Sequence, residues 1–109
     1  MDINPSDKKI LFSLLNQYLP HTTIWAYGSR IKGNAQPWSD LDLVVFTGAE
    51  QGYQVSLLKE ALEESNLTFR VQIFEWDSLP DNFKTNIKAQ HEVLAHGTHT
   101  SAAISQSNR

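Results

Sequence analysis

Two aspartates and a Gly-Ser pair give residues 28–43, GSRIKGNAQPWSDLDL, the strongest chemical signal in the chain. Asp40 and Asp42 stand one residue apart at the start of an apolar run, and on a β-strand such side chains leave the same face. Their oxygens suit Mg²⁺, and two such ions about 4 Å apart would stabilise the attacking and leaving oxygens of a displacement at phosphorus. The pair therefore predicts a site for metal-assisted phosphoryl chemistry.

The beginning of the same segment predicts a cradle for phosphate. Gly28 can bring its backbone close to a phosphate because it has no Cβ, and Ser29 adds a hydroxyl and a backbone N–H group. Arg30 and Lys32 would neutralise phosphate charge. The loop over residues 33–37 contains Gly and Pro, which favour a turn that brings the serine and the aspartates to one cleft.

Hydrophobic periodicity predicts the elements that must position these residues. Asn4 and Pro5 are typical of a helix start, and apolar residues then recur at helical spacing until Pro20. The expected elements are a helix over 5–19, strands over 23–27 and 41–47, a helix over 52–65, a strand over 69–76 and a helix that starts near residue 78. This order predicts an α/β sandwich with a three-stranded core sheet and helices packed against it.

The C-terminal part of the chain is expected to hold a last helix and a tail. Phe83, Ile87, His91 and Leu94 recur at helical spacing after a capping-box-like start. From residue 95 onward the sequence is small and polar, without periodicity. We therefore expect a catalytic domain over residues 1–94 and a flexible tail over 95–109.

Composition limits the function classes. The 109 residues fit one domain, and a net charge of −3 gives no broad basic face for binding a nucleic acid directly. The chain contains no cysteine, so a thiolate metal site is excluded and a reducing compartment is compatible. No signal peptide and no long apolar run is present. We expect a cytoplasmic protein with no membrane association.

The ordered set of a strand, Gly28-Ser29, ten residues, Asp40-x-Asp42 and a second strand resembles the signature of the DNA polymerase beta-like nucleotidyltransferase superfamily. The short chain looks like the minimal nucleotidyltransferases, and the likeness covers about residues 5 to 94. The resemblance implies a polymerase beta-like α/β fold with a small mixed sheet. It also implies that Gly28 and Ser29 hold the triphosphate of ATP, while Asp40 and Asp42 ligate Mg²⁺.

The resemblance also implies a partner. Minimal nucleotidyltransferases of this type are similar to the antitoxins of HEPN toxin–antitoxin pairs, in which the HEPN protein is an RNase. Members of that family transfer AMP from ATP to a tyrosine of the toxin and silence it. The expected protein is thus a Mg²⁺-dependent protein adenylyltransferase that forms a hetero-oligomer with its toxin.

One position departs from the family pattern. Active members of the superfamily usually supply a third carboxylate from the next long strand, where this chain has Gln72. A neutral amide cannot take the proton of an attacking hydroxyl. Glu75 is a candidate substitute only if a bulge corrects its strand parity.

Alternative functions remain open at this point. The first is a catalytically weak or inactive module that neutralises the toxin by binding, which Gln72 favours. The second is a transferase for a small molecule, although such enzymes generally carry a further domain that the chain has no room for. Trp38, in the loop before the aspartates, is a candidate for base stacking or for an interface.

Overall fold

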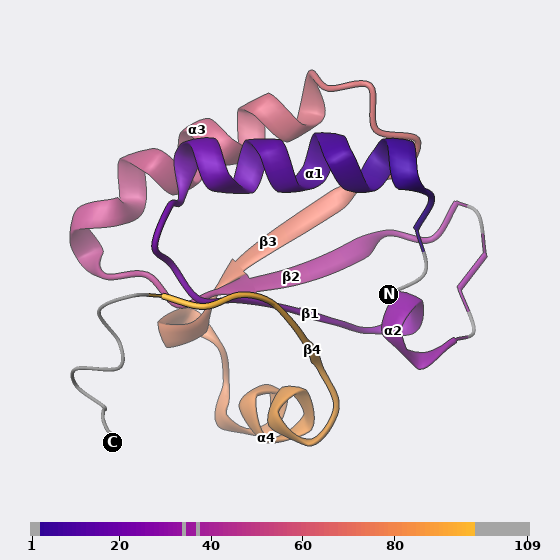
Figure 1. Cartoon of the computed structure of the whole chain (residues 1–109). Helices are drawn as coiled ribbons and strands as arrows, with labels where there is room; N and C mark the ends of the chain where they lie inside the picture. Colours follow the sequence, from indigo (N-terminus) through magenta and orange to yellow (C-terminus); the bar gives the residue numbers. More distant parts are fainter. Residues whose placement is uncertain (1–2, 34, 37, 98–109) are drawn as a thin grey trace.

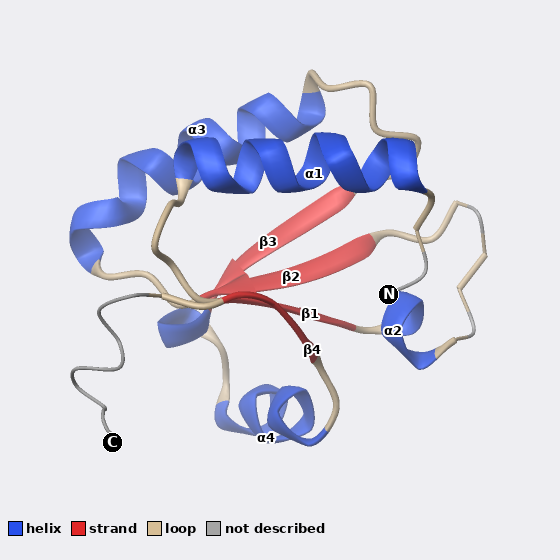
Figure 2. Ribbon diagram, in the orientation of Figure 1, coloured by secondary structure: helices blue, strands red, loops and turns tan. Residues whose placement is uncertain are grey.

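The computed structural model describes residues 3–33, 35–36 and 38–97 and shows two helices packed on one face of a sheet (Figure 1). The helices are α1 (Pro5–Tyr18), α2 (Ser29–Lys32), α3 (Gly52–Glu63) and α4 (Asp81–Ala89), and the strands are β1 (Ile24–Tyr27), β2 (Leu41–Val45), β3 (Val71–Glu75) and β4 (Glu92–Ala95). Short 3₁₀ turns, η1 (Ala49–Gln51) and η2 (Trp76–Ser78), precede α3 and follow β3. Helices α1 and α3 lie together on one side of the sheet, and α4 lies on the other side (Figure 2).

The strands form one mixed sheet in the order β3-β2-β1-β4. Strand β1 is antiparallel to β2 and to β4, whereas β2 and β3 are parallel. The parallel pair is connected through α3, as a crossover between parallel strands requires. The expected mixed α/β architecture is confirmed, but the sheet has four strands where the sequence predicted three.

The fourth strand occupies residues that were expected to continue the last helix. Helix α4 ends at Ala89, because the next residue, Gln90, has extended backbone angles of φ −149° and ψ 106°. The chain then turns back, and Glu92–Ala95 pairs with the free edge of β1. His91 was expected on a helix face. Instead its ring stacks on Trp25, with the ring centroids 3.8 Å apart.

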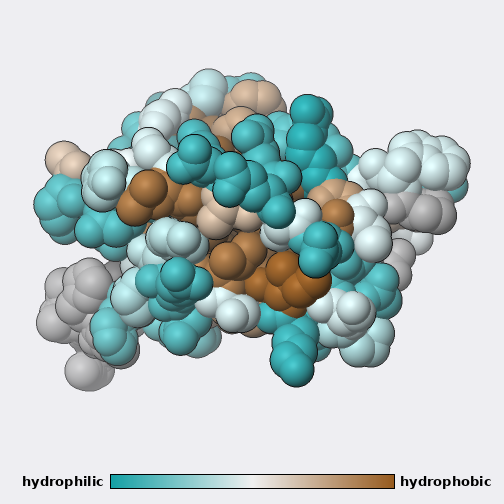
Figure 3. Space-filling view, turned by 90° about the horizontal axis from the view of Figure 1, so that it is seen from above, coloured by the Kyte–Doolittle hydropathy of each residue, from teal (hydrophilic) through white to brown (hydrophobic). Residues whose placement is uncertain are grey.

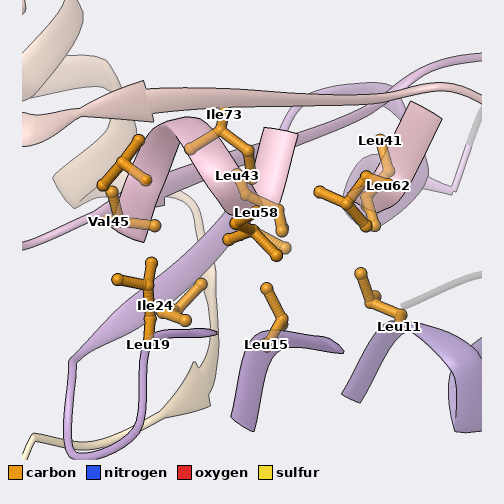
Figure 4. Packing of buried hydrophobic residues seen from close by; sticks show 12 residues of the cluster. Leu11, Leu15, Leu19, Ile24, Leu41, Leu43, Val45, Leu58, Leu62 and Ile73 are labelled. Atoms are coloured by element: carbon orange, nitrogen blue, oxygen red, sulfur yellow. The ribbon is translucent and has the colours of Figure 1, made fainter. Parts of the chain in front are cut away.

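The hydrophobic core lies between the sheet and the helices α1 and α3. Figure 4 shows leucines of both helices meeting apolar side chains of β1, β2 and β3. Leu11, Leu58, Leu41 and Leu43 have no solvent exposure. The odd-numbered residues of β2 thus face this core, so that Asp42 lies on the opposite face of the sheet.

The outer surface of α1 and α3 is mostly hydrophilic, with a smaller hydrophobic area near its middle (Figure 3). This distribution matches amphipathic helices that turn their apolar sides to the sheet. Among the residues described, no helix is both long enough and apolar enough to cross a membrane.

The described chain ends in an ordered contact. Gly97 is buried, and its backbone N–H donates a hydrogen bond to Thr23 Oγ1 at 2.8 Å. The domain boundary that we expected after residue 94 therefore falls inside β4, and residues 95–97 are part of the fold. The rest of the expected tail, residues 98–109, lies outside the described residues.

A buried aspartate ties the start of α1 to the segment before β3. Asp7 is 2% exposed and accepts hydrogen bonds from the Asn4 side chain and from the backbone N–H and hydroxyl of Thr68. Replacing Asp7 by Ala removes three hydrogen bonds to a buried carboxylate, so we expect the free energy of unfolding to fall by about 3 kcal/mol.

Urea unfolding followed by tryptophan fluorescence measures this change. Asp81→Ala is the control, because Asp81 is also in the first turn of a helix but is exposed. We expect the control to change the free energy of unfolding by less than about 0.5 kcal/mol. An equal loss in both variants would contradict the assigned role of Asp7.

Candidate active site

The residues predicted to do chemistry meet at one end of the sheet. Strand β1 leads into Gly28 at this end, whereas β2 and β3 begin there, because β2 is antiparallel to β1 and parallel to β3. Asp42 pairs with Tyr27 on one side and with Gln72 on the other. Neighbouring strands lie about 4.8 Å apart. The glycine turn, the aspartates and Gln72 therefore form a row across three strands.

Asp40 is held from the β3 side of this row. Its Oδ2 accepts a hydrogen bond from Gln72 Nε2 at 2.6 Å and forms an ion pair with Arg70 Nη2 at 3.2 Å. The Arg70 side chain is 71% exposed, so this ion pair contributes little to stability. The position expected to hold a third carboxylate instead presents an amide that donates to the first carboxylate.

Asp42 is in contact with the glycine turn. Gly28 has a φ of +90°, and a Cβ at this position would lie 2.7 Å from Asp42 Oδ2. Both the backbone angle and the space require glycine here. Burial and the Asp42 carboxylate together raise the pKa of the neighbouring Tyr27 to about 12.

The environment of Asp42 disfavours its charge. Burial raises the pKa of Asp42 above its ordinary value of 3.8, and the nearby Asp40 carboxylate raises it further. A divalent cation would relieve both effects, because it offsets the repulsion and replaces the lost hydration. The unfavourable negative charge of the two carboxylates therefore fits a site for a metal cation. Among the residues described, no group of three or more His, Cys, Asp or Glu side chains surrounds them.

The raised pKa predicts that Asp42→Asn stabilises the metal-free protein at neutral pH. The folded state binds the Asp42 proton more strongly than the unfolded chain does, so wild-type stability falls as the pH rises from the ordinary pKa through the raised one. Asparagine has no carboxyl group that titrates, so the variant lacks this pH-dependent loss of stability. We therefore expect the variant to have the higher Tm at pH 7 and the difference to shrink as the pH approaches 3.8.

Thermal melts in EDTA between pH 4 and pH 7 test this, with Asp77→Asn as the exposed control. A variant that melts below the wild type at pH 7 would show that Asp42 stabilises the fold in its charged form, contrary to this prediction.

Two pockets flank the aspartates. On the β1 side, a pocket of about 450 Å³ is lined by Tyr27, Gly28, Lys32 and residues of α4 that include Phe83 and Ile87. On the β3 side, a pocket of about 440 Å³ contains Asp40 itself and is lined by the end of α3 and the segment that leads into β3. The carboxylates thus have space for a different molecule on each side.

The other predicted site residues divide into two groups. Ser29 begins α2, and Lys32 lines the β1-side pocket together with Gly28. Arg30 has an environment that we did not expect. It is buried, its Nε donates to the Ser39 carbonyl oxygen at 3.0 Å, and its guanidinium lies 4.2 Å from the centroid of the Phe69 ring. These contacts join Arg30 to the loop before β2 and to the segment before β3.

Glu75 and Trp38 also have clear positions. Glu75 pairs with Val45 at the far end of β3, and its Oε1 accepts a hydrogen bond from Thr47. The structure does not bring Glu75 to the aspartates. Trp38 is 75% exposed and lines the pocket that contains Asp40.

Arg70 and Tyr27 were not among the residues predicted for the site. Arg70 stands two residues before Gln72, as Asp40 does before Asp42, so the parallel register places both Arg70 and Gln72 beside the aspartates. That shared spacing was a usable signal once β2 and β3 were paired. Tyr27, directly before Gly28, was interpreted only as part of a buried strand.

Comparison with known proteins identifies the class. The sequence profile described as "Polymerase beta, Nucleotidyltransferase" matches residues 9–99. The chain therefore belongs to this nucleotidyltransferase family. It is 35% identical, over 95 residues, to the "Probable protein adenylyltransferase MntA" of Haemophilus influenzae, a match that covers 86% of this chain and 83% of the relative.

Solved structures share the fold. One is a mutant of the toxin–antitoxin MntA–HpeT, with a TM-score of 0.63 and 19% identity, covering 94% of this chain and 80% of that one. Another is a toxin–antitoxin with AMP-PNP, with a TM-score of 0.59 and 18% identity, covering 88% and 78%. At these identities the likeness shows the polymerase beta-like fold that the sequence predicted.

Proposed function

We propose that this chain is the antitoxin of a toxin–antitoxin pair and that it transfers AMP from ATP to a tyrosine hydroxyl of a HEPN-domain RNase. The observation that carries the proposal is the contact of the Gly28 turn with Asp42, because it joins a phosphate cradle to a carboxylate pair. The relative named as a probable protein adenylyltransferase supports the reaction, and the toxin–antitoxin structures support the partner.

The proposed reaction exchanges a phosphoanhydride bond of ATP for a phosphodiester bond to tyrosine. The tyrosine oxygen forms a bond to the α-phosphorus of ATP, the bond from that phosphorus to the oxygen bridging to the β-phosphorus breaks, and pyrophosphate leaves. Gln72 cannot accept the hydroxyl proton, so the proton passes to water. The tyrosine of the toxin becomes a phosphodiester of AMP, and the protein is otherwise unchanged.

The residues of this chain have separate roles in that reaction. Gly28 and Ser29 would hold the β- and γ-phosphates, with Lys32 neutralising charge in the same pocket. Asp40 and Asp42 would hold Mg²⁺. A carboxylate pair of this kind suits two such ions. The metal supplies stabilisation of charge on the attacking and leaving oxygens. The sheet end would contribute by positioning the two reactants for attack.

A second candidate function is neutralisation by binding alone. Gln72 in place of a carboxylate is the observation that favours it, because Gln72 already satisfies Asp40 with a hydrogen bond at 2.6 Å and offers no base. The fold and the partner surface would then be kept without catalysis.

Mass spectrometry of the intact toxin separates the two functions. The proposed HEPN partner is expressed in a ribonuclease-inactive form, alone and together with this chain, and the intact mass of each preparation is measured. A gain of one or more AMP units only on co-expression supports the transferase. An unmodified toxin in a stable complex with this chain, together with protection of cells from the active toxin, supports binding alone.

A further inference from the structure

No residue of the Gly28 turn lines the pocket on the β3 side of the aspartates. It lies at the start of β3 and is lined by Asp40, Trp38, Leu62, Glu63, Phe69 and Arg70, among others. We call it the β3-side pocket. Because Asp40 is part of its wall, a group bound in it lies against one of the two carboxylates.

The pocket opens on the α3 side of the sheet, whereas Asp42 faces the other side, so a ligand in the pocket reaches the aspartate pair past Asp40 at the end of the sheet. The order of the strands then indicates which reactant this pocket can serve. The Gly28 turn follows β1, the aspartates begin β2, and the β3-side pocket lies beyond β2 at the start of β3. In an in-line displacement the attacking oxygen approaches opposite to the leaving group. Pyrophosphate leaves toward the Gly28 turn, which is on the β1 side. The attacking hydroxyl must therefore come from the β3 side.

The charge of the pocket also argues against a triphosphate. Asp40 and Glu63 place two carboxylates in its wall, and the single cation, Arg70, is already paired with Asp40 at 3.2 Å. Helix α3 adds the exposed Glu60, with Glu64 directly after its end, against one exposed cation, Lys59, so the charge of this end stays negative. This surface repels phosphates and attracts a basic segment. A toxin that cleaves RNA needs positive charge to bind the phosphate backbone.

The apolar part of the wall suits an aromatic ring. Leu62 and Phe69 provide a hydrophobic surface beside Asp40, and Trp38 stands at the pocket with 75% of its surface exposed. An exposed tryptophan beside a carboxylate is typical of an anchor for a partner side chain. The volume of about 440 Å³ accommodates a tyrosine together with its neighbours in a peptide.

We propose that the β3-side pocket binds the basic, tyrosine-bearing segment of the partner toxin, with the tyrosine ring against Trp38 and Phe69 and its hydroxyl toward Asp40. This inference rests on the proposed AMP transfer and deepens it. It makes Trp38 and Glu63 the residues that select the acceptor, without a part in binding ATP.

Steady-state transfer of AMP to the ribonuclease-inactive toxin tests the inference. We expect Trp38→Ala to raise the KM for the toxin at least about tenfold, because aromatic anchors dominate such contacts. We expect Glu63→Lys to raise the same KM and to weaken its dependence on salt. In both variants the affinity of the isolated chain for AMP-PNP should stay within about twofold of wild type. Tyr53→Ala, on α3, is the matched control, since Tyr53 is 73% exposed and outside the pocket.

Each outcome decides one of the proposals. A toxin KM unchanged in Trp38→Ala, while the wild type transfers AMP, overturns the acceptor pocket and leaves the transferase intact. Weaker AMP-PNP binding in either variant overturns it too, because the pocket would then hold the nucleotide. If the wild type transfers no AMP to the toxin, the transferase proposal is wrong, and the acceptor role of the pocket is wrong as well. Circular dichroism of each variant checks that the fold is retained.

Discussion

Replacing Asp40 and Asp42 together by asparagine is expected to lower the rate of AMP transfer by about 10³-fold or more, while the toxin remains bound. Loss of both negative ligands removes the metal and its stabilisation of the phosphoryl oxygens, which is worth several kcal/mol, and about 1.4 kcal/mol corresponds to tenfold in rate. The fold should survive, because burial and mutual repulsion already oppose the charge on Asp42.

Single-turnover transfer measured with labelled ATP, together with toxin affinity measured by calorimetry, tests this expectation. Asp77→Asn removes an exposed carboxylate from η2, away from the aspartate pair, and should leave both quantities unchanged. If the double variant still transfers AMP at a rate within tenfold of wild type, the carboxylate pair is not the metal site. If the double variant loses toxin binding as well, the aspartates belong to the interface.

Gln72→Asp is expected to raise the rate of AMP transfer, on the order of 10²-fold, if chemistry limits the wild type. The aspartate would supply the base that the amide lacks, and general bases contribute about 10²–10⁴ in rate. The same change replaces the 2.6 Å hydrogen bond to Asp40 by repulsion between two carboxylates. The variant should therefore have a lower Tm than wild type in EDTA and should recover much of that loss when Mg²⁺ is added.

Gln72→Asn is the matched control, because asparagine has the shape of aspartate without its charge. We expect Gln72→Asn to show neither the faster transfer nor the Mg²⁺-dependent recovery of Tm. Equal rates in Gln72→Asp, Gln72→Asn and wild type would mean that position 72 takes no part in proton transfer. The transferase proposal would then need no third carboxylate at all.

The local parts of this molecule could be predicted because each is defined by residues close in sequence. Helix α1 begins at Pro5 with Asn4 as its N-cap, as expected, and β2 begins directly after Asp40. Gln72 was expected at the site because of the likeness to a family. That expectation did not require a long-range contact to be predicted from the sequence. The structure pairs the two through the parallel register of β2 and β3.

The parts that could not be predicted depend on contacts between distant segments. No glycine or proline marks the end of α4, and Leu94 keeps helical spacing with His91, so periodicity alone favoured a longer helix. Pairing of residues 92–95 with β1 overrides that local preference. Arg30 similarly looked like a phosphate ligand because of its neighbours in sequence. Its ring contact with Phe69 joins residues 39 positions apart in the chain, which no local pattern reveals.

The opposite ends of the described chain emerge at opposite ends of the sheet. Ile3 and Asn4 line a pocket with Arg30, next to α2, whereas Gly97 is bonded to Thr23 at the other end of β1 (Figure 1). An affinity tag or fluorophore joined before residue 3 would start beside the proposed reaction site and compete for space with a partner. A label attached after residue 97 would start at the far end of β1. Immobilisation through that end is therefore the better design for measuring toxin binding on a sensor surface.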